Sequence, residues 1–215
     1  MLKVENLYKN FGNKRVLENI SFELADGEIV CLRGKSGAGK TTLIRCICNL
    51  EKADKGTIAI DGISSLEDGK PNKAYQDKVG MVSQGLDLFH NLTVMENITL
   101  APVSRKLTTK ETAQQAAQDL LDSLGIGDKA DSYPAQLSGG EKQRAAVARA
   151  CVLSPSVLFF DEPTSALDVS SAKEVANLIE SIAAKNISIV VISHDENFCS
   201  MLPARTIVVK DGKIL

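Results

Sequence analysis

Three short segments of the chain combine residue types that can bind and transfer phosphate. Residues 34–41, Gly-Lys-Ser-Gly-Ala-Gly-Lys-Thr, match the pattern G-x-x-x-x-G-K-[ST] between a strand-like run and a helical pattern. Glycines let backbone N–H groups turn toward phosphate oxygens, and a helix N-terminus adds partial positive charge. The full spacing disfavours a merely flexible turn and predicts a phosphate-binding loop, in which Lys40 neutralises the terminal phosphates and the Thr41 hydroxyl binds Mg²⁺. The residues expected to contact the nucleotide here are Gly34, Lys35, Ser36, Gly37, Ala38, Gly39, Lys40, Thr41 and Thr42.

The second segment is the acidic pair Asp161 and Glu162, which follows the apolar run 157–160. Open α/β sheets bind ligands at the carboxyl ends of their strands, so this is a favourable place for catalytic carboxylates. Asp161 is expected to bind the same Mg²⁺ through water, and Glu162 to polarise an attacking water. A solvated acidic turn would explain the pair if it stood alone. The run Pro-Thr-Ser-Ala-Leu-Asp at 163–168 favours the site.

The third segment is Leu-Ser-Gly-Gly-Glu at residues 137–141. Ser138 is a typical helix N-cap, and Gly139 and Gly140 would expose the N–H donors of a helix start to an anion. Read alone, the segment could serve only as a loop and a cap. Beside a complete phosphate loop it is a second anion site, and the two together predict that two copies of the chain share a nucleotide.

The elements that must position these segments follow from the apolar pattern. Residues 2–33 alternate like antiparallel strands, with turns at 12–13 and 26–27. The continuous apolar runs 157–160 and 188–192 alternate with helical patterns, which indicates a parallel sheet buried on both faces. The fold class is therefore α/β, a P-loop core with a mixed, mainly parallel sheet and an N-terminal antiparallel portion. Further short strands are expected at 57–60 and 79–83.

Helical patterns begin at about residues 39, 108, 138 and 168. The segment Thr-Thr-Lys-Glu at 108–111 is a capping box, and the helix after it is expected to bury Ala113, Ala117, Leu120, Leu121 and Leu124. Residues 91–153 are almost wholly helical between two sheet strands. We therefore expect one domain of 215 residues, with a core formed by 1–90 and 154–215 and a helical subdomain at 91–153.

Composition excludes several classes of protein. Hydrophobic residues make up 44% of the chain and charged residues 24%, which is ordinary for a soluble globular protein. The formal net charge of −2 offers no general basic field for nucleic acid. No apolar run approaches the ~20 residues of a membrane span, and the first residues do not form a signal peptide. Five cysteines beside apolar neighbours are expected to be reduced and buried, rather than disulfide-bonded or metal-binding.

The motifs together resemble those of ATP-binding-cassette (ABC) ATPase subunits, in the family's order and over essentially the whole chain. They are residues 34–41, Gln84, 137–141, 160–162, 165–168 and His194. The resemblance implies ATP hydrolysis with Mg²⁺. It assigns catalytic roles to Glu162, His194, Gln84 and Lys40, and metal contacts to Thr41, Gln84 and Asp161. A GTPase would need the guanine-reading pattern N-K-x-D, which the sequence lacks.

Other roles also rest on the resemblance. Ser138, Gly139 and Gly140 would face the γ-phosphate of ATP bound to a partner subunit, and Asp168 would help to connect the two sites. His194 would bond the γ-phosphate, and Gln84 would contact the metal and the water. Phe11 would stack on adenine, with Tyr8 as the rival ring. ATP would join two ATPase subunits, expected to be a homodimer.

The resemblance also implies a membrane partner. The segment 84–98 is a candidate surface for docking a permease, through Leu86, Leu88, Phe89, Leu92 and Val94. Its sequence is similar to that of ATPases of polar amino-acid importers, although Glu141, Lys142 and Asp195 differ from the residues common in that subgroup. We expect a cytoplasmic protein, held at the inner face of the cell membrane by the permease, with a solute-binding protein as a further partner and no regulatory domain after residue 212.

Three alternatives stay open from the sequence. They are an exporter ATPase, the ATPase of a non-transporting membrane complex, and an ABC protein that acts on nucleic acid or ribosomes.

Overall fold

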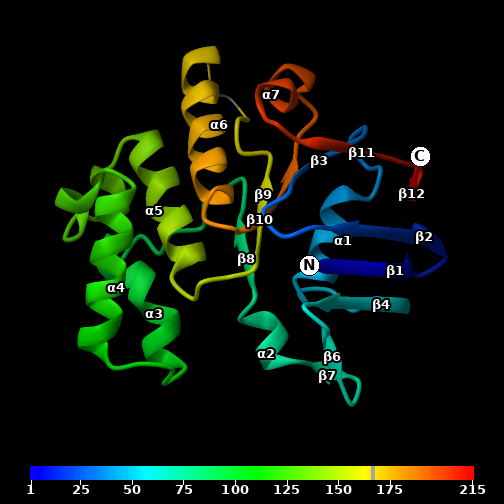
Figure 1. The fold of residues 1–215 in the computed structure, drawn as a ribbon, viewed down its shortest axis with the longest axis horizontal. Helices are drawn as coiled ribbons and strands as arrows, with labels where there is room; N and C mark the ends of the chain where they lie inside the picture. Colours follow the sequence, from blue (N-terminus) through cyan, green and yellow to red (C-terminus); the bar gives the residue numbers. More distant parts are fainter. Residues whose placement is uncertain (166–167) are drawn as a thin grey trace. The chain divides into compact units, whose positions relative to one another are not determined.

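The computed structural model describes residues 1–165 and 168–215 (Figure 1). These residues form two compact units, Met1–Gln84 with Ser156–Leu215, and Gly85–Pro155. The sequence pattern places the helical segment at 91–153. In the structure residues 85–90 belong to the same unit, because the buried Asn97 side chain bonds the backbone of Phe89. Ala166 and Leu167, in the middle of the motif at 163–168, lie outside the described residues.

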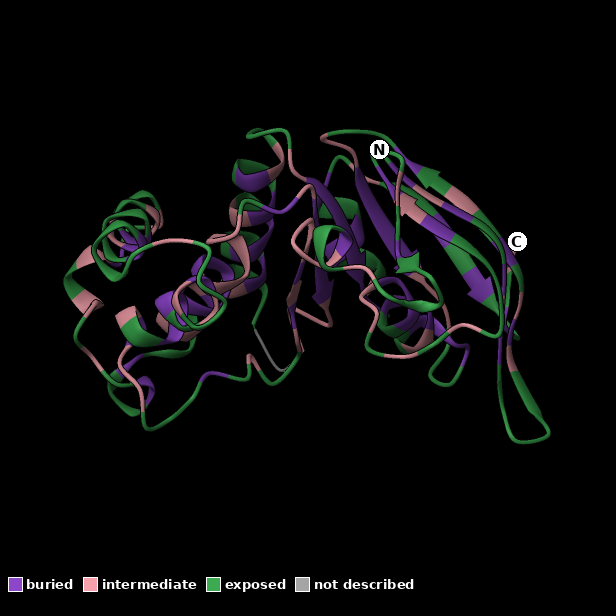
Figure 2. Ribbon diagram, turned by 90° about the horizontal axis from the view of Figure 1, so that it is seen from below, coloured by how far each residue is buried: buried purple, intermediate pink, exposed green. Residues whose placement is uncertain are grey.

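A six-stranded sheet forms the centre of the first unit, in the order β12-β11-β3-β10-β9-β8. The first five strands along the chain pair in parallel, and only β12 is antiparallel, to β11. Every residue of β10 is buried, as are the first four of β9, which agrees with their continuous apolar sequence (purple in Figure 2). The strands are β3 Ile29–Arg33, β8 Val79–Val82, β9 Val157–Asp161, β10 Ser188–Ile192, β11 Arg205–Lys210 and β12 Lys213–Ile214.

An antiparallel sheet completes the first unit, in the order β2-β1-β4-β5. Its strands are β1 Leu2–Phe11, β2 Lys14–Leu24, β4 Lys55–Ile60 and β5 Ile63–Ser64. The register of β1 with β2 shifts between Val4 and Leu7, where Asn6 has φ of 47°. This bulge changes which residues of β1 face inward, because side chains alternate along a strand. Before it Leu2 and Val4 are buried, and after it Leu7 and Lys9 are.

One core joins the two sheets of this unit. It contains apolar residues from both sheets and from helix α1, Lys40–Ile47. Helix α1 buries Leu43, Ile44, Cys46 and Ile47, so the helix that begins at the phosphate loop is fixed along its length. The remaining elements of the unit are α2 Lys73–Gln76, α6 Val169–Ala183, α7 Glu196–Met201, and the hairpin of β6 Leu66–Glu67 and β7 Lys70–Pro71.

The second unit is helical. Its helices are α3 Val94–Ser104, α4 Lys110–Ser123 and α5 Gly139–Cys151, with short 3₁₀ turns at Gly127–Lys129 and Pro134–Gln136. The predicted cap of α4 is one residue early. Thr109 rather than Thr108 is the N-cap and accepts a bond from the Thr112 amide, because the helical hydrogen bonds begin at residue 113.

Burial along α4 is narrower than its apolar pattern suggests. Ala113, Ala117 and Leu121 are buried, whereas Leu120 and Leu124 are only half-buried. The five cysteines, all of them in the described part of the chain, form no disulfides; Cys31, Cys46 and Cys199 are buried and the other two are half-buried. In the described part of the chain every helix is too short or too polar to cross a lipid bilayer.

Candidate functional site

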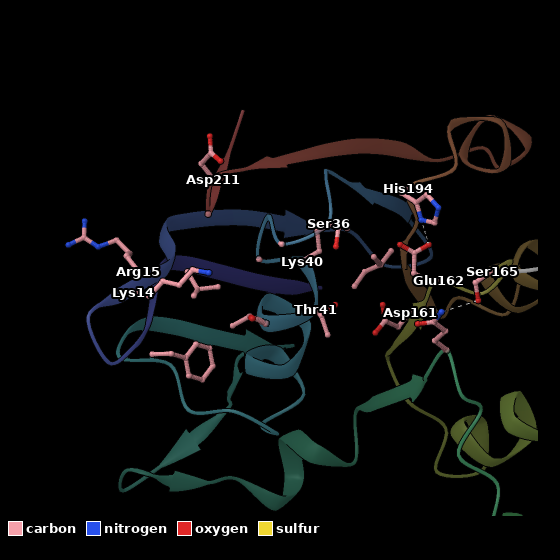
Figure 3. Close-up of a pocket in the computed structure, with 18 residues that line it drawn as sticks. Lys14, Arg15, Ser36, Lys40, Thr41, Asp161, Glu162, Ser165, His194 and Asp211 are labelled. Carbon is pink, nitrogen blue, oxygen red and sulfur yellow. Dashed lines mark hydrogen bonds and ion pairs between the residues drawn. The ribbon is translucent and has the colours of Figure 1, made fainter.

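A pocket of about 1010 Å³ opens in the first unit, where the phosphate loop meets the ends of β9 and β10 (Figure 3). Its volume is at the upper end of the range for small-molecule sites. Eleven predicted site residues line it: Phe11, Ser36, Gly37, Gly39, Lys40, Thr41, Thr42, Gln84, Asp161, Glu162 and His194. Seven further residues also line it: Ser165, which belongs to the motif at 165–168, and six that the sequence did not indicate, Lys14, Arg15, Val16, Ile192, Asp211 and Gly212.

The phosphate loop is packed tightly enough to require glycine at two positions. Gly34 has φ of 155°, and a Cβ there would lie 2.2 Å from the carbonyl oxygen of Val209. Gly39 has φ of 103°, and its Cβ would lie 2.8 Å from the carbonyl of Val16. Both positions are strained for any side chain. The loop is thus held in shape by β2 and β11, which leaves its inner backbone free for a ligand.

The Lys40 side chain bonds back to the beginning of the phosphate loop. Its ammonium is buried and donates to the carbonyl oxygens of Gly34, at 2.6 Å, and Lys35, at 3.2 Å. Lys40 is also the first residue of α1, so its charge lies beside the positive end of that helix. Two sources of positive potential therefore coincide, which suits the binding of a polyphosphate.

The two neighbouring carboxylates have different surroundings. Asp161 is the last residue of β9 and is half-buried, and this desolvation, followed by the negative charge of Glu162, raises the pKa of its carboxyl group. Glu162 has φ of 50°, a left-handed conformation uncommon outside glycine, and its amide donates to the carbonyl of Ile192 at 2.9 Å. This left-handed turn follows the end of β9, and the Glu162 carboxylate contacts His194, which follows β10.

Glu162 has a partner from the next strand. Nδ1 of His194 lies 2.8 Å from Oε2 of Glu162, an interaction drawn as a dashed line in Figure 3. His194 follows β10 and is well exposed, whereas Glu162 is mostly buried. On the same side of the pocket, Nε2 of Gln84 donates to Oγ of Ser165 at 3.3 Å, also a dashed line in Figure 3. The structure therefore brings together Gln84, Glu162 and His194. In the sequence Gln84 is about eighty residues before Glu162, and His194 is about thirty residues after it.

The oxygen donors of this pocket fit a magnesium ion that arrives with a nucleotide. Thr41, Gln84 and Asp161 supply a hydroxyl, an amide oxygen and a carboxylate, which are hard donors of the kind Mg²⁺ prefers. Among the described residues no group of three or more His, Cys, Asp or Glu side chains is placed to hold a metal alone. Mg²⁺ usually keeps waters and phosphate oxygens as its remaining ligands.

The predicted second anion site lies in the second unit, at the start of α5. Ser138 caps the helix and forms a reciprocal capping box with Glu141: the backbone N–H of Ser138 donates to that carboxylate at 2.8 Å, and the Glu141 amide donates to Oγ of Ser138 at 3.3 Å. The backbone N–H and hydroxyl of Ser138 lower the pKa of Glu141. Ser138, Gly139 and Gly140 are all exposed.

Gly139 and Gly140 differ from the phosphate-loop glycines. A Cβ at either would meet nothing within 4 Å, and neither has a positive φ. Within the described residues neither the packing nor the backbone conformation therefore requires glycine here. Asp168, the remaining residue of the predicted partner-facing set, caps α6 by accepting from the Ser171 amide at 2.8 Å.

The segment 84–98 presents less apolar surface than its sequence suggests. Leu88 and Val94 are buried in the second unit, so they contribute to its core and not to a docking face. Phe89 is 49% exposed, and Asn97 bonds its backbone on both sides, at 2.7 Å to the amide and 3.1 Å to the carbonyl. Among the described residues of this unit, the exposed large hydrophobic side chains are those of Phe89, Leu100, Leu107 and Tyr133.

Comparison with known sequences agrees with this geometry. The family model described as ABC transporter matches residues 17–165. Over its whole length the chain is 41% identical to the arginine transport ATP-binding protein ArtM of Bacillus subtilis (strain 168), 90% of which is covered. It is also 41% identical to the glutamate transport ATP-binding protein GluA of Corynebacterium glutamicum, 89% covered, and 37% identical to the glutamine transport ATP-binding protein GlnQ of Escherichia coli (strain K12), likewise 89% covered.

Solved structures give the same result. The dimeric structure of MJ0796, described as a bacterial ABC transporter cassette, superposes with a TM-score of 0.83 at 32% identity, covering all of this chain and 96% of that one. A post-hydrolysis state of the same cassette, bound to ADP and Pi, gives a TM-score of 0.84 at 32% identity with the same coverage. The predicted mixed α/β fold, with an antiparallel portion, a mainly parallel sheet and helices, is confirmed by these matches.

Proposed function

The chain belongs to the ABC transporter family and is an ATP hydrolase of the ABC type, and from this premise we propose that it energises uptake of a polar amino acid through a membrane permease. The names of the similar relatives support the substrate class, since they are arginine, glutamate and glutamine transport ATP-binding proteins. Their similarity extends over the whole of this chain. The proposed location is the cytoplasmic face of the membrane, where the permease would hold the protein.

The pocket provides the groups that hydrolysis needs. Lys40 and the amides at the start of α1 would bind the phosphates, and Glu162 would accept a hydrogen bond from the attacking water. His194 would orient that carboxylate through their 2.8 Å contact. Thr41, Gln84 and Asp161 would hold Mg²⁺, which when bound neutralises charge on the phosphates. Phe11 would stack on the adenine, since it lines the pocket whereas Tyr8 does not.

We further propose that two copies of the chain enclose the nucleotide, and the glycines of α5 carry this proposal. Glycine in a helix is less favourable than alanine by up to about 1 kcal/mol, and nothing in the described chain requires it at Gly139 or Gly140. A close approach by something outside the chain explains both residues. An exposed helix N-terminus favours an anion, and the γ-phosphate of ATP on a second copy is an anion of the right kind.

The test is Glu162→Gln, which keeps the shape of the side chain but removes its basicity. Phosphate release should fall by about 10²- to 10⁴-fold, the usual contribution of a general base, while ATP still binds. ATP should then hold the variant as a dimer in gel filtration, and ADP should not. Lys40→Ala, which lacks the phosphate contact, is the control and should remain monomeric with either nucleotide. An undiminished rate, or a monomer in ATP, would contradict the proposal.

The solute is tested separately, through the partner. Affinity purification from membranes should recover a permease, and reconstituted vesicles should accumulate a labelled polar amino acid only when ATP is supplied on the ATPase side. Uptake of arginine, glutamate and glutamine should be compared directly. Efflux instead of uptake would refute the importer assignment but leave the ATPase assignment intact.

A further inference from the structure

We propose that Lys9 is a positioning residue for the nucleotide base, because its ammonium lies against the protein side of the Phe11 ring. This inference rests on the proposed ATP site and on Phe11 as its stacking ring. It adds a second layer to that contact: a buried cation, then the aromatic ring, then the base. The residues that build it are Lys9, Phe11 and Glu51.

The geometry of this layer is well defined. Nζ of Lys9 lies 4.7 Å from the centroid of the Phe11 ring, over its face. Phe11 lines the pocket and is 49% exposed, whereas Lys9 does not line it and is 7% exposed. The cation is therefore on the protein side of the ring, and the opposite side is available to a ligand in the pocket.

The bulge in β1 creates this arrangement. Lys9 is buried and Phe11 is exposed although they are two residues apart, because a further register shift lies between Lys9 and Asn10. The register shift at Asn6 turns Leu7 and Lys9 inward in place of Asn6 and Tyr8. Gly56 permits the bulge, since a Cβ there would lie 2.5 Å from the carbonyl oxygen of Asn6.

Lys9 is held by the loop that follows α1. Its ammonium donates to Oε1 of Glu51 at 2.6 Å and to the carbonyl of Lys52 at 2.8 Å. An ammonium has three N–H donors, which leaves one beyond these two for the ring. The hydrogen bond to Glu51 raises the pKa of Lys9, so the side chain stays a cation over the ordinary pH range.

The same loop fixes the strand end that carries Phe11. Oδ2 of Asp54 accepts from the backbone amide of Asn10 at 2.6 Å and from its side-chain amide at 2.7 Å. The Asp54 amide donates to the carbonyl of Tyr8 at 2.9 Å. The Glu51 amide bonds the carbonyl of Arg45 in α1, at 3.0 Å. The ring is thus anchored to the C-terminal end of α1, the helix that follows the phosphate loop.

This construction has a purpose beyond packing. Burying a lysine is costly unless it is paired, and an apolar residue would fill the space under a ring without that cost. A cation over one face of an aromatic ring fixes the ring and withdraws electron density toward itself. The other face then becomes a better partner for an electron-rich purine. Lys9 should therefore act on the base and leave the phosphates unaffected.

The experiment compares two ligands on the full chain. Dissociation constants for ATP and for inorganic triphosphate, which has no base, are measured by calorimetry in the presence of Mg²⁺. Lys9→Met should weaken ATP binding by about three- to tenfold and leave triphosphate binding unchanged within about twofold. Lys9→Arg, which can also lie over a ring, should retain most of the ATP affinity. Lys70→Met, on the exposed β6–β7 hairpin, is the matched control and should change neither constant.

A double-mutant cycle identifies the ring as the route. In a Phe11→Leu background, Lys9→Met should have no further effect on ATP. Equal losses for ATP and triphosphate would overturn the proposal in favour of a purely structural role through α1, and so would an unchanged affinity for ATP. If Lys9→Met does not fold, Glu51→Gln, which only loosens the ammonium, should show the same base-dependent loss to a smaller degree. Failure of the unmodified chain to bind ATP would instead refute the proposed function.

Discussion

Asp161 and Glu162 are neighbours along the chain, yet the protein treats their carboxyl groups differently. Asp161 is desolvated at the end of β9 and faces the charge of Glu162, so its pKa is raised. Glu162 has a left-handed backbone conformation and is in contact with His194. The ionised Asp161 carboxylate therefore destabilises the free protein, whereas the Glu162 carboxylate is held by a side-chain partner.

Asp161→Asn should make the nucleotide-free protein more stable at neutral pH, although it weakens binding of Mg²⁺-ATP. A raised pKa in the folded state means that ionisation of Asp161 opposes folding. This penalty is present at neutral pH, is relieved as the pH falls through the raised pKa, and is gone below the unfolded value of 3.8. Because the carboxyl group is only half-buried, the gain should be about 0.5–1 kcal/mol, or about 2 °C in Tm.

Urea unfolding of both proteins at several pH values checks this prediction. The difference between Asp161→Asn and the unmodified chain should be largest near pH 7 and should shrink toward pH 4. A difference that is independent of pH would show that charge is not its cause. Asp119→Asn, on the exposed face of α4, is the control.

For single residues, the sequence predicts the pocket residues that belong to contiguous motifs. It misses those that reach the pocket only through the fold. Lys40, Thr41, Asp161 and Glu162 belong to short patterns whose spacing has a local physical reason. Ile192 and Asp211 reach the pocket only because β10 and β11 lie on either side of β3, the strand that leads into the phosphate loop. Lys9 carries no sequence signal either, because its inward direction depends on the bulge at Asn6.

Among the elements, the start of α5 is where one substitution should raise stability and lower ATP hydrolysis. Gly140→Ala should stabilise the chain slightly, by about 0.5 kcal/mol, because alanine favours a helix and its Cβ meets nothing in the described chain. The same methyl group would obstruct a phosphate held by a second copy. ATP hydrolysis should therefore fall by about 10²-fold, comparable to the loss of one anion-stabilising donor.

The measurements are chemical unfolding of the monomer and phosphate release at saturating ATP. Gly125→Ala is the matched control in the same unit. Gly125 has φ of 70°, so this variant should lose stability yet keep the hydrolysis rate at temperatures where it is folded. If Gly140→Ala hydrolysed ATP at the normal rate, α5 would not approach a nucleotide.

Element types follow closely from the apolar pattern, whereas their ends follow less closely. Strand β10 has the predicted bounds, since a fully buried strand is continuous in sequence and ends where polarity begins. The start of α4 is predicted one residue early, because Thr108 and Thr109 are equally good caps and only the observed bond to Thr112 decides between them. The small strands β5, β6 and β7 are too short to show a period.

For the whole molecule, nucleotide should protect the two units at different stages. A ligand at 100 times its Kd stabilises the folded state by about 2.7 kcal/mol. In hydrogen exchange, ATP bound to the monomer should slow exchange within Met1–Gln84 and Ser156–Leu215, around the phosphate loop and the ends of β9 and β10. The amides at 138–141 should gain protection only when the chain dimerises.

Glu162→Gln with ATP provides the dimeric sample, and Lys40→Ala provides the unliganded one. Protection of residues 138–141 in dilute, monomeric protein would contradict the two-copy arrangement. Uniform protection of the whole chain would contradict the separation into two units. The helical patterns in the sequence predict a separate helical unit. The boundaries of that unit depend on contacts such as those of Asn97, which no local pattern reveals.

The supports of the phosphate loop also set an order on its synthesis. Gly34 is shaped by the carbonyl of Val209, and the amide of Gly212 donates to the carbonyl of Ala38 at 3.2 Å. A loop encoded early is therefore finished by residues translated almost 180 positions later. We therefore expect a nascent polypeptide on the ribosome to gain affinity for ATP only after that distant turn has emerged.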